Sequence, residues 1–292
     1  MARGDTDIIQ RFLFEDFNVR GELVRLEDAY GEVLEQRPYP SSVGVLLGEV
    51  MAATALLSAT IKFRGTLTLQ VNTGGPLKLL MAECRDQSDL RAIARFDEEI
   101  EGPWLGDGKL VITIEPHQGE RYQGIVAIGH DNLAHAIENY FRQSEQIGTR
   151  LWLAADGTRA AGLMIQRLPG TADRPGLEHG DDDWQRVMML AGTVSGDELL
   201  SLEPKSLLTR LFHEEHVRVF DARTLRFHCN CSRERSANAI KFLGFDEAMA
   251  LVGEQGEMEI DCQFCHARYR FGGEEVRGVF EREAPPAGTT LH

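Results

Sequence analysis

Two close cysteine pairs near the C-terminus constrain this chain more than any other feature. Four of its five cysteines lie in Cys229-Asn230-Cys231 and Cys262-Gln263-Phe264-Cys265, with thirty residues between the pairs. The N-terminus, MARGDTDIIQRF, has no apolar signal-peptide core, so we expect a cytoplasmic protein whose cysteines stay reduced. In that setting such pairs indicate metal ligands or redox-active thiols rather than permanent structural disulfides.

The residues around the pairs predict a small folded unit. Ser232 can cap a helix with Ala237, Ile240 and Leu243 on one face, and Asp246 can cap a second short helix. Residues 257–262 and 267–271 alternate as two strands on either side of the Cys-x-x-Cys turn, which is typical of a zinc knuckle. A unit of this size rarely folds on its apolar core alone, so a metal is expected to stabilise it.

Four thiolates fill a tetrahedron around one zinc ion. We therefore expect one Zn²⁺ per chain and no open coordination position at which a substrate could react. The predicted metal ligands are Cys229, Cys231, Cys262 and Cys265.

The remaining cysteine and four histidines are expected to play no part in this site. Cys84, alone in LLMAECRD, is predicted to be a buried core residue. His228 and His266 adjoin the pairs, but the tetrahedron is already complete. His213 and His216 are spaced i, i+3 and lack the HExxH order of zinc hydrolases, which favours an exposed helix end.

Charge and composition exclude several function classes. The net charge is −15, and residues 1–175, 176–228 and 229–284 are each acidic overall, which disfavours binding to nucleic acid. The longest apolar stretch, 43–61, is interrupted by Gly48, Glu49 and Ser58, and it indicates a buried helix rather than a membrane span. No GxSxG, GxxxxGK or acid–base pair is recognisable, so no enzymatic activity is expected.

The first part of the chain mixes strand and helix periods, which predicts an α+β fold with antiparallel sheets. A long helix to Thr60 can be capped by Ser41 or Ser42, and a helix over 133–146 by Asp131 or Asn132. The predicted strands are 7–14, 17–26, 65–71, 77–82, 110–114, 122–128, 152–155 and 161–168. The Pro- and Gly-rich stretch 168–176 indicates a domain boundary.

Residues 177–226 predict only short helices. Asp183 can cap a helix over 184–190, Ser195 a helix over 197–202, and Pro204 fits the first turn of a helix ending at Phe212. Helices of this length are marginally stable in isolation and depend on packing against other parts of the protein.

The cysteine chemistry leaves two interpretations open. If both pairs were oxidised to disulfides, no thiolate would remain for zinc, and the unit would lose its main source of stability. Such a site could report oxidation by unfolding. The same four cysteines could instead hold a permanent structural zinc, which the cysteine chemistry taken alone favours.

Further stretches make the chain recognisable. CNCSRERSANAI followed by CQFCHARYRF resembles the redox-regulated bacterial 33 kDa heat-shock chaperone family, whose pattern is CxC, about thirty residues, then CxxC. Residues 46–84, 90–95, 138–154 and 210–221 are also similar to that family, so the resemblance extends over nearly the whole chain.

The resemblance implies a redox-regulated holdase that is zinc-bound and inactive when reduced. Oxidation would form the disulfides Cys229–Cys231 and Cys262–Cys265, release zinc and unfold the middle segment, residues 177–228. The active form would be a homodimer that binds unfolding client proteins. The implied regions are a core for client binding and dimerisation (1–176), a metastable helical linker (177–228), a redox-sensing zinc domain (229–284) and a tail (285–292). A permanently folded zinc-ribbon module for protein interaction is the alternative.

The apolar residues of the middle segment are the expected client-binding side chains, because methionine and leucine surfaces adapt to varied partners. They are Trp184, Val187, Met188, Leu199, Leu207, Leu211 and Phe212, together with Met189, Leu200 and Leu208.

Overall fold

The computed structural model describes residues 6–62, 64–97, 104–129, 132–169 and 181–281. The chain divides into two compact units, residues 1–228 and 229–292, and each is described by itself. The domain boundary predicted at 176 and the tail at 285–292 lie outside the described residues.

Unit 1 contains two largely antiparallel sheets, which confirms the predicted α+β class. Sheet A has the strand order β10 (Val217–Val219), β1 (Ile8–Phe14), β2 (Val19–Leu26), β9 (Ala160–Arg167) and β8 (Thr149–Ala155), and β11 (Arg223–Thr224) also pairs with β1. Sheet B has the order β12 (Arg226–Phe227), β5 (Asp89–Phe96), β4 (Leu77–Arg85), β3 (Gly65–Thr73), β6 (Gly108–Pro116) and β7 (Tyr122–Ile128). The β12–β5 pair is parallel.

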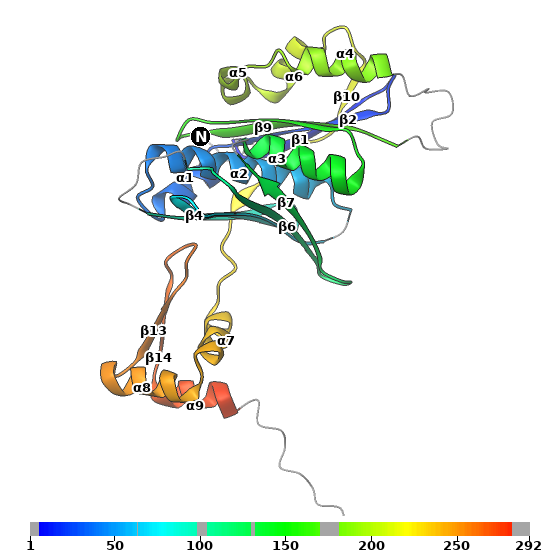
Figure 1. Cartoon of the computed structure of the whole chain (residues 1–292). Coiled ribbons are helices and arrows are strands. Elements are labelled where there is room, and N and C mark those ends of the chain that lie inside the picture. The colour runs from blue at the N-terminus through cyan, green and yellow to red at the C-terminus, as the bar shows by residue number, and fades with distance from the viewer. Residues whose placement is uncertain (1–5, 63, 98–103, 130–131, 170–180, 282–292) are drawn as a thin grey trace, which may run out of the picture. The chain divides into compact units, whose positions relative to one another are not determined.

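Helix α2 (Ser41–Thr60) lies between the two sheets, as Figure 1 shows. It is long and apolar enough to cross a membrane by length and composition, but 72% of its most apolar window is buried inside the protein. It packs with α1 (Asp28–Glu35), α3 (Leu133–Tyr140) and the inner faces of both sheets in one continuous core. The apolar stretch is therefore a core helix, as its interruptions indicated.

The opposite face of sheet A is also buried. Helices α4 (Asp181–Ala191), α5 (Gly196–Ser201) and α6 (Pro204–Phe212) cover it and form a second core with β1, β2, β8 and β9 (Figure 1). Phe212 packs edge-on against Phe14, with ring centroids 5.0 Å apart. Phe12 lies across Gly21 on the neighbouring strand, where a Cβ atom would come within 2.0 Å of the ring. Sheet A is thus an internal layer of unit 1.

Some of the predicted local signals were confirmed and others were not. The helix predicted over 184–190 is α4, but it begins at Asp181, so Asp183 lies inside its first turn and does not cap it. Asn132 caps α3 and Ser195 forms a capping box with Glu198, while Pro204 begins α6. Helix α3 continues as a π-helical turn, η1 (Phe141–Glu145). The cap predicted for α2 was wrong, because Pro40 precedes the helix and no side chain accepts a capping hydrogen bond.

Several elements were not predicted. Helix α1 lacks a local cap, and the Asp7 carboxylate instead accepts from the backbone N–H groups of Glu27 and Ala29, at 2.6 and 2.7 Å. Strand β5 was also missed. Strands β10, β11 and β12 are only two or three residues long, and they exist because β1 and β5 offer unpaired edges.

A buried carboxylate on β2 makes the stability of unit 1 depend on pH. The Glu22 side chain is 1% exposed, its nearest ion-pair atom is Arg11 Nε at 3.9 Å, and neither oxygen has a hydrogen-bond partner among the described residues. Burial raises the pKa of Glu22 to about 7, partly opposed by Arg20, Arg11 and Arg223. The folded state therefore holds this proton more tightly than the unfolded state, and stability falls as pH rises through the window from about 4.5 to 7.

Replacing Glu22→Gln should remove this pH dependence. The difference in free energy of unfolding, variant minus wild type, should be larger at pH 8 than at pH 4.5 by up to about 3 kcal/mol. At pH 8 the wild type must bury a charged carboxylate, whereas the variant has no charge at this position. Urea unfolding at both pH values measures the difference, and exposed Glu115→Gln is the control. A wild-type-to-variant difference that stays constant with pH would contradict the assignment.

Candidate metal centre

Unit 2 is a small scaffold with a small core. It consists of α7 (Arg233–Leu243), α8 (Phe245–Gln255), β13 (Met258–Asp261), β14 (Arg268–Phe271) and α9 (Gly273–Glu281). Its buried apolar residues are Ile240, Ala248, Val252, Met258, Phe271 and Val276. So few side chains provide limited hydrophobic stabilisation, which is the situation in which small domains depend on a metal or cross-link.

The local sequence sets most of these elements. Ser232 caps α7, as predicted, by accepting from the backbone N–H of Arg235. Helix α8 departs from the prediction, because it begins at Phe245 after Gly244 with no side-chain cap from Asp246, and it runs to Gln255. Leu243, expected on the inner face of α7, is 39% exposed.

The second cysteine pair occupies a tight turn between β13 and β14. The Cys262 N–H donates to the Ala267 carbonyl and the His266 N–H donates to the Cys262 carbonyl, both at 2.9 Å. His266 has a φ of 54°, a left-handed conformation that lets the turn close. This is the predicted strand–turn–strand knuckle, and it fixes the direction of both thiols.

The first cysteine pair lies in the extended segment before α7. The helix cap at Ser232 holds this segment on one side, and Arg235 Nη1 donates to the Asn230 carbonyl at 3.1 Å. Cys229 and Cys231 are therefore positioned by the first turn of α7, whereas Cys262 and Cys265 are positioned by the knuckle.

The four thiols meet in one cluster. The sulfur atoms all lie within 4.8 Å of one another, with Cys229 Sγ 3.6 Å from Cys262 Sγ and Cys231 Sγ 3.4 Å from Cys265 Sγ. All four are free thiols. Ligands about 2.3 Å from a tetrahedral ion lie about 3.8 Å apart, so these separations fit a single metal ion held by four sulfurs.

Electrostatics in the cluster also favour a cation. Although desolvation opposes its ionisation, the pKa of Cys231 is lowered by hydrogen bonds, first from the Tyr269 hydroxyl at 3.2 Å and then from the neighbouring thiols. Burial raises the pKa of Cys265. Without a cation, thiolates this close would repel one another, so the protons are distributed unequally among the thiols. A divalent ion would allow all four to ionise.

The histidines and Cys84 lie apart from this cluster. Among the described residues, the metal-competent group contains the four cysteines and neither His228 nor His266. His213 and His216 have exposed side chains, and His216 Nδ1 lies 2.8 Å from an Asp16 carboxylate oxygen. Cys84 is buried in unit 1, where burial raises its pKa to about 12.

The residues expected to bind clients are mostly covered in this structure. Trp184 and Met188 are partly buried against the second core of unit 1, and Met189 is 69% exposed. The others lie inside that core: Val187, Leu199, Leu200, Leu207, Leu208, Leu211 and Phe212. They face sheet A, so they could contact another protein only after leaving it.

Sequence reasoning missed the face of sheet A on which these helices pack. Phe12 and Phe14 of β1 belong to the core under α4–α6, whereas Ile9 belongs to the core around α2. A strand with apolar residues on both faces, as in IIQRFLF, is a signal of burial on both sides. Tyr269 was also missed, since nothing local marks a tyrosine as a hydrogen-bond donor to a thiol.

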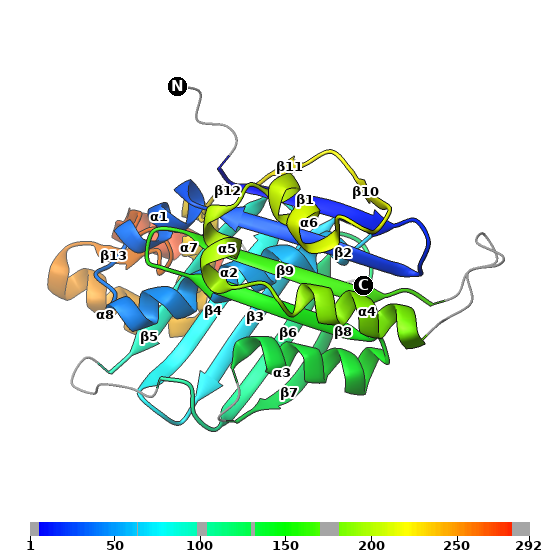
Figure 2. The same cartoon turned by 90° about the horizontal axis from the view of Figure 1, so that it is seen from above.

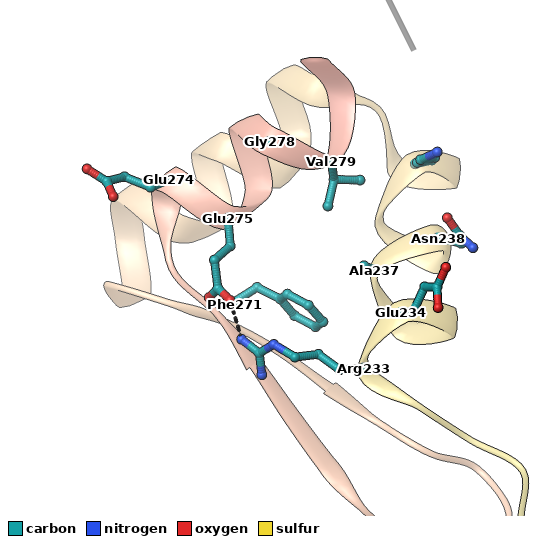
Figure 3. Close-up of a pocket in the computed structure, with 10 residues that line it drawn as sticks. Arg233, Glu234, Ala237, Asn238, Phe271, Glu274, Glu275, Gly278 and Val279 are labelled. Carbon is teal, nitrogen blue, oxygen red and sulfur yellow. Dashed lines mark hydrogen bonds and ion pairs between the residues drawn. The ribbon is translucent and has the colours of Figure 1, made fainter. Parts of the chain in front are cut away.

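A groove of about 770 Å³ also lies in unit 2, between α7 and α9 (Figure 3). The Phe271 ring forms its floor, with the Arg233 guanidinium 4.6 Å from the ring centroid. Arg233 also donates to Glu275 at 2.6 Å, which joins the two walls. Nearby Phe242 is 94% exposed.

Comparisons with known proteins agree with this geometry. The sequence profile of the family described as "Hsp33 protein" matches residues 7–272. The chain is 50% identical over 283 residues to the 33 kDa chaperonin of Pseudomonas savastanoi pv. phaseolicola, covering 94% of each chain. It is 47% identical to the 33 kDa chaperonin of Azotobacter vinelandii, covering 94% of this chain and 95% of that one.

A solved structure has the same fold. The crystal structure of the 33 kDa chaperonin (heat shock protein 33 homolog) from Thermotoga maritima superposes with a TM-score of 0.81 at 20% identity, covering 95% of this chain and 99% of that chain. Together with the family profile and the relatives at about half identity, the cysteine cluster leads to one conclusion. This chain belongs to the Hsp33 protein family.

Proposed function

We propose that this chain is a cytoplasmic redox-controlled holdase: inactive with zinc bound, and activated when oxidation of its cysteines releases the ion. The observation that carries the proposal is the cluster of four free thiols within 4.8 Å in a unit with a very small core. Membership of a family whose relatives are named chaperonins supports a role in binding unfolding proteins rather than an enzymatic one.

Zinc is the ion that fits this donor set. Four thiolates with tetrahedral separations are typical of structural zinc sites, and zinc has no redox chemistry of its own. Electrons removed by an oxidant therefore come from the sulfurs. The ion would contribute roughly 10–16 kcal/mol of apparent binding free energy, nearly all of it as folding free energy of unit 2.

Oxidation would convert the cluster into two disulfides, Cys229–Cys231 and Cys262–Cys265. Two peroxide molecules accept four electrons from the four thiolates, four protons complete four molecules of water, and the ion leaves as Zn²⁺. The closest sulfurs in the cluster belong to different pairs, so the connectivity within each pair is proposed from the family resemblance.

The middle segment would respond to oxidation because its helices are not stable without packing against other parts of the protein. Helices α4, α5 and α6 have 11, 6 and 9 residues, below the length at which isolated helices are stable. The segment ends with β12 and His228, and Cys229 follows directly. The backbone N–H of His228 donates to the Leu90 carbonyl. Loss of order at Cys229 would remove the anchor at this end.

Release of the segment would expose two apolar surfaces together. One consists of the α4–α6 residues proposed to bind clients, and the other is the face of sheet A that carries Phe12, Phe14, Leu23, Leu163 and Ile165. We include homodimerisation of the oxidised form in the proposal. The acidic surface supports proteins, rather than nucleic acids, as partners.

A permanently folded zinc ribbon that binds a protein partner is the second candidate. The groove between α7 and α9 and the exposed Phe242 favour it, because both are present in the folded unit with all four cysteines reduced. The two candidates differ in one property: a structural ribbon should keep its metal in mild oxidant.

Metal and thiols should change together on oxidation. The reduced chain should contain about one zinc, and peroxide with mild heat should release it while the thiol count falls from five to the single buried Cys84. A metallochromic dye, a thiol reagent under denaturing conditions and mass mapping of the disulfides measure this. Suppression of client aggregation on the same samples should appear only after oxidation. Retained metal, or equal activity in both states, would rule out the switch.

Replacing Cys262→Ser should loosen the protein without any oxidant. With one ligand lost, unit 2 and the middle segment should open more often, and limited proteolysis within 181–281 should be about tenfold faster or more. Cys84→Ala is the matched control, since that cysteine lies in unit 1 outside the cluster. An unchanged cleavage pattern for Cys262→Ser would contradict the coupling.

A further inference from the structure

The outer edge of β1 is covered by the chain's own residues 215–225. Antiparallel pairs join Phe12 to Val219, Leu13 to Arg218 and Phe14 to Val217, and β11 pairs with the other end of the same strand. Figure 2 shows β10 and β11 along β1. A strand at the edge of a sheet presents unpaired N–H and C=O groups, and here the middle segment satisfies them.

The hydrogen-bond pattern shows which groups face outward. Glu15 N–H donates to the His216 carbonyl at 2.9 Å, Phe220 N–H to the Arg11 carbonyl at 3.0 Å, and Leu225 N–H to the Asp7 carbonyl at 2.8 Å. In an antiparallel ladder, hydrogen-bonded pairs alternate along the strand. Odd-numbered residues of β1 therefore bond outward to the middle segment, whereas even-numbered residues bond inward to β2.

Side chains alternate in the same register. Val217 and Val219 lie opposite Phe14 and Phe12, and both pack against the core beneath α4–α6. Arg218 points to the other face, where it forms an ion pair with Glu15 at 2.6 Å. The segment that covers the edge is thus extended, with apolar residues at alternate positions.

We propose that the vacated β1 edge binds clients by strand addition. An extended client segment takes the place of Val217–Val219, hydrogen-bonds to the outward groups of β1, and inserts alternate apolar side chains beside Phe12 and Phe14. This inference rests on the proposed release of the middle segment. It defines the client chemistry as an unfolded, extended segment with alternating apolar residues, recognised largely through its backbone.

Strand addition accounts for two requirements of a holdase. Backbone recognition tolerates varied sequences, and the adjacent apolar face of sheet A adds affinity without specifying one side chain. Access to the β1 edge would also depend on redox state, since the folded middle segment occupies that edge. Sheet B also has an edge strand, β7, which pairs only with β6 among the described residues. Strand addition to β7 would therefore not depend on oxidation.

Residue-resolved amide hydrogen exchange on the full chain tests the proposal. Oxidation should speed exchange at the amides of Leu13 and Glu15, which donate to the middle segment, and a peptide of residues 214–221 (EEHVRVFD) at saturation should slow it again. The Gln10 and Phe12 amides, which face β2, should stay protected throughout and serve as the internal control. If oxidised protein suppresses aggregation while the Leu13 and Glu15 amides stay protected, or if those amides still exchange fast with peptide bound, strand addition is wrong and the proposed function survives. If oxidation changes neither exchange nor aggregation, the proposed function itself fails.

Backbone-methylated peptides separate strand addition from simple apolar contact. N-methylation at Arg218 blocks a donor that faces β1, whereas N-methylation at Val219 modifies an amide that faces away. Binding of labelled peptide to the oxidised chain should weaken about tenfold or more for the first and less than about twofold for the second. Equal affinities for the two peptides, or equal binding by the reduced chain, would overturn the assignment to the β1 edge.

Discussion

Four thiols held within 4.8 Å of one another impose the constraint on which the rest of this protein depends. Two like charges 4 Å apart near a protein surface repel by roughly 4 kcal/mol, so four thiolates cannot share this space without a cation. Over its described residues, 229–281, the scaffold that brings them together has a core of only six buried apolar side chains. The proposed ion would therefore stabilise both the cluster and the scaffold.

The two hydrophobic cores of unit 1 would respond differently to a change at the cysteines. The core around α2 joins residues from both sheets and three helices, and it contains no residue of unit 2. Under the proposed function, oxidation of the cysteines would leave that core intact. The second core differs, because one of its two layers consists of the short helices α4–α6, which end shortly before Cys229. Under the proposed function, the outer face of sheet A thus separates the structure that stays folded from the structure that is released.

The sequence predicts most of what is decided locally. The knuckle at Cys262, the caps at Asn132, Ser195 and Ser232 and the proline that begins α6 all follow from residues a few positions apart. Helix α1 was missed because its cap, Asp7, lies about twenty residues away, and α8 was placed wrongly because its start is set by Gly244. Strands β10–β12 depend on pairing with β1 and β5, which no local pattern reveals. The ligand set was predictable because it needs only spacing and chemistry, whereas the covered face of sheet A requires the tertiary fold.

The same few residues that cover β1 also solve a general problem of β-sheets. An uncovered edge beside the exposed phenylalanines of sheet A would pair with any extended chain, including another copy of this protein. The short strand β10 covers this edge. Under the proposed function that protection depends on the state of the cysteines, because the adjoining helices α4–α6 are too short to be stable in isolation. A three-residue strand contributes few hydrogen bonds, so its departure costs little once α4–α6 have left. If both proposals hold, the strand pairing that prevents aggregation in the reduced state gives way, in the oxidised state, to a sheet edge that captures chains which would otherwise aggregate.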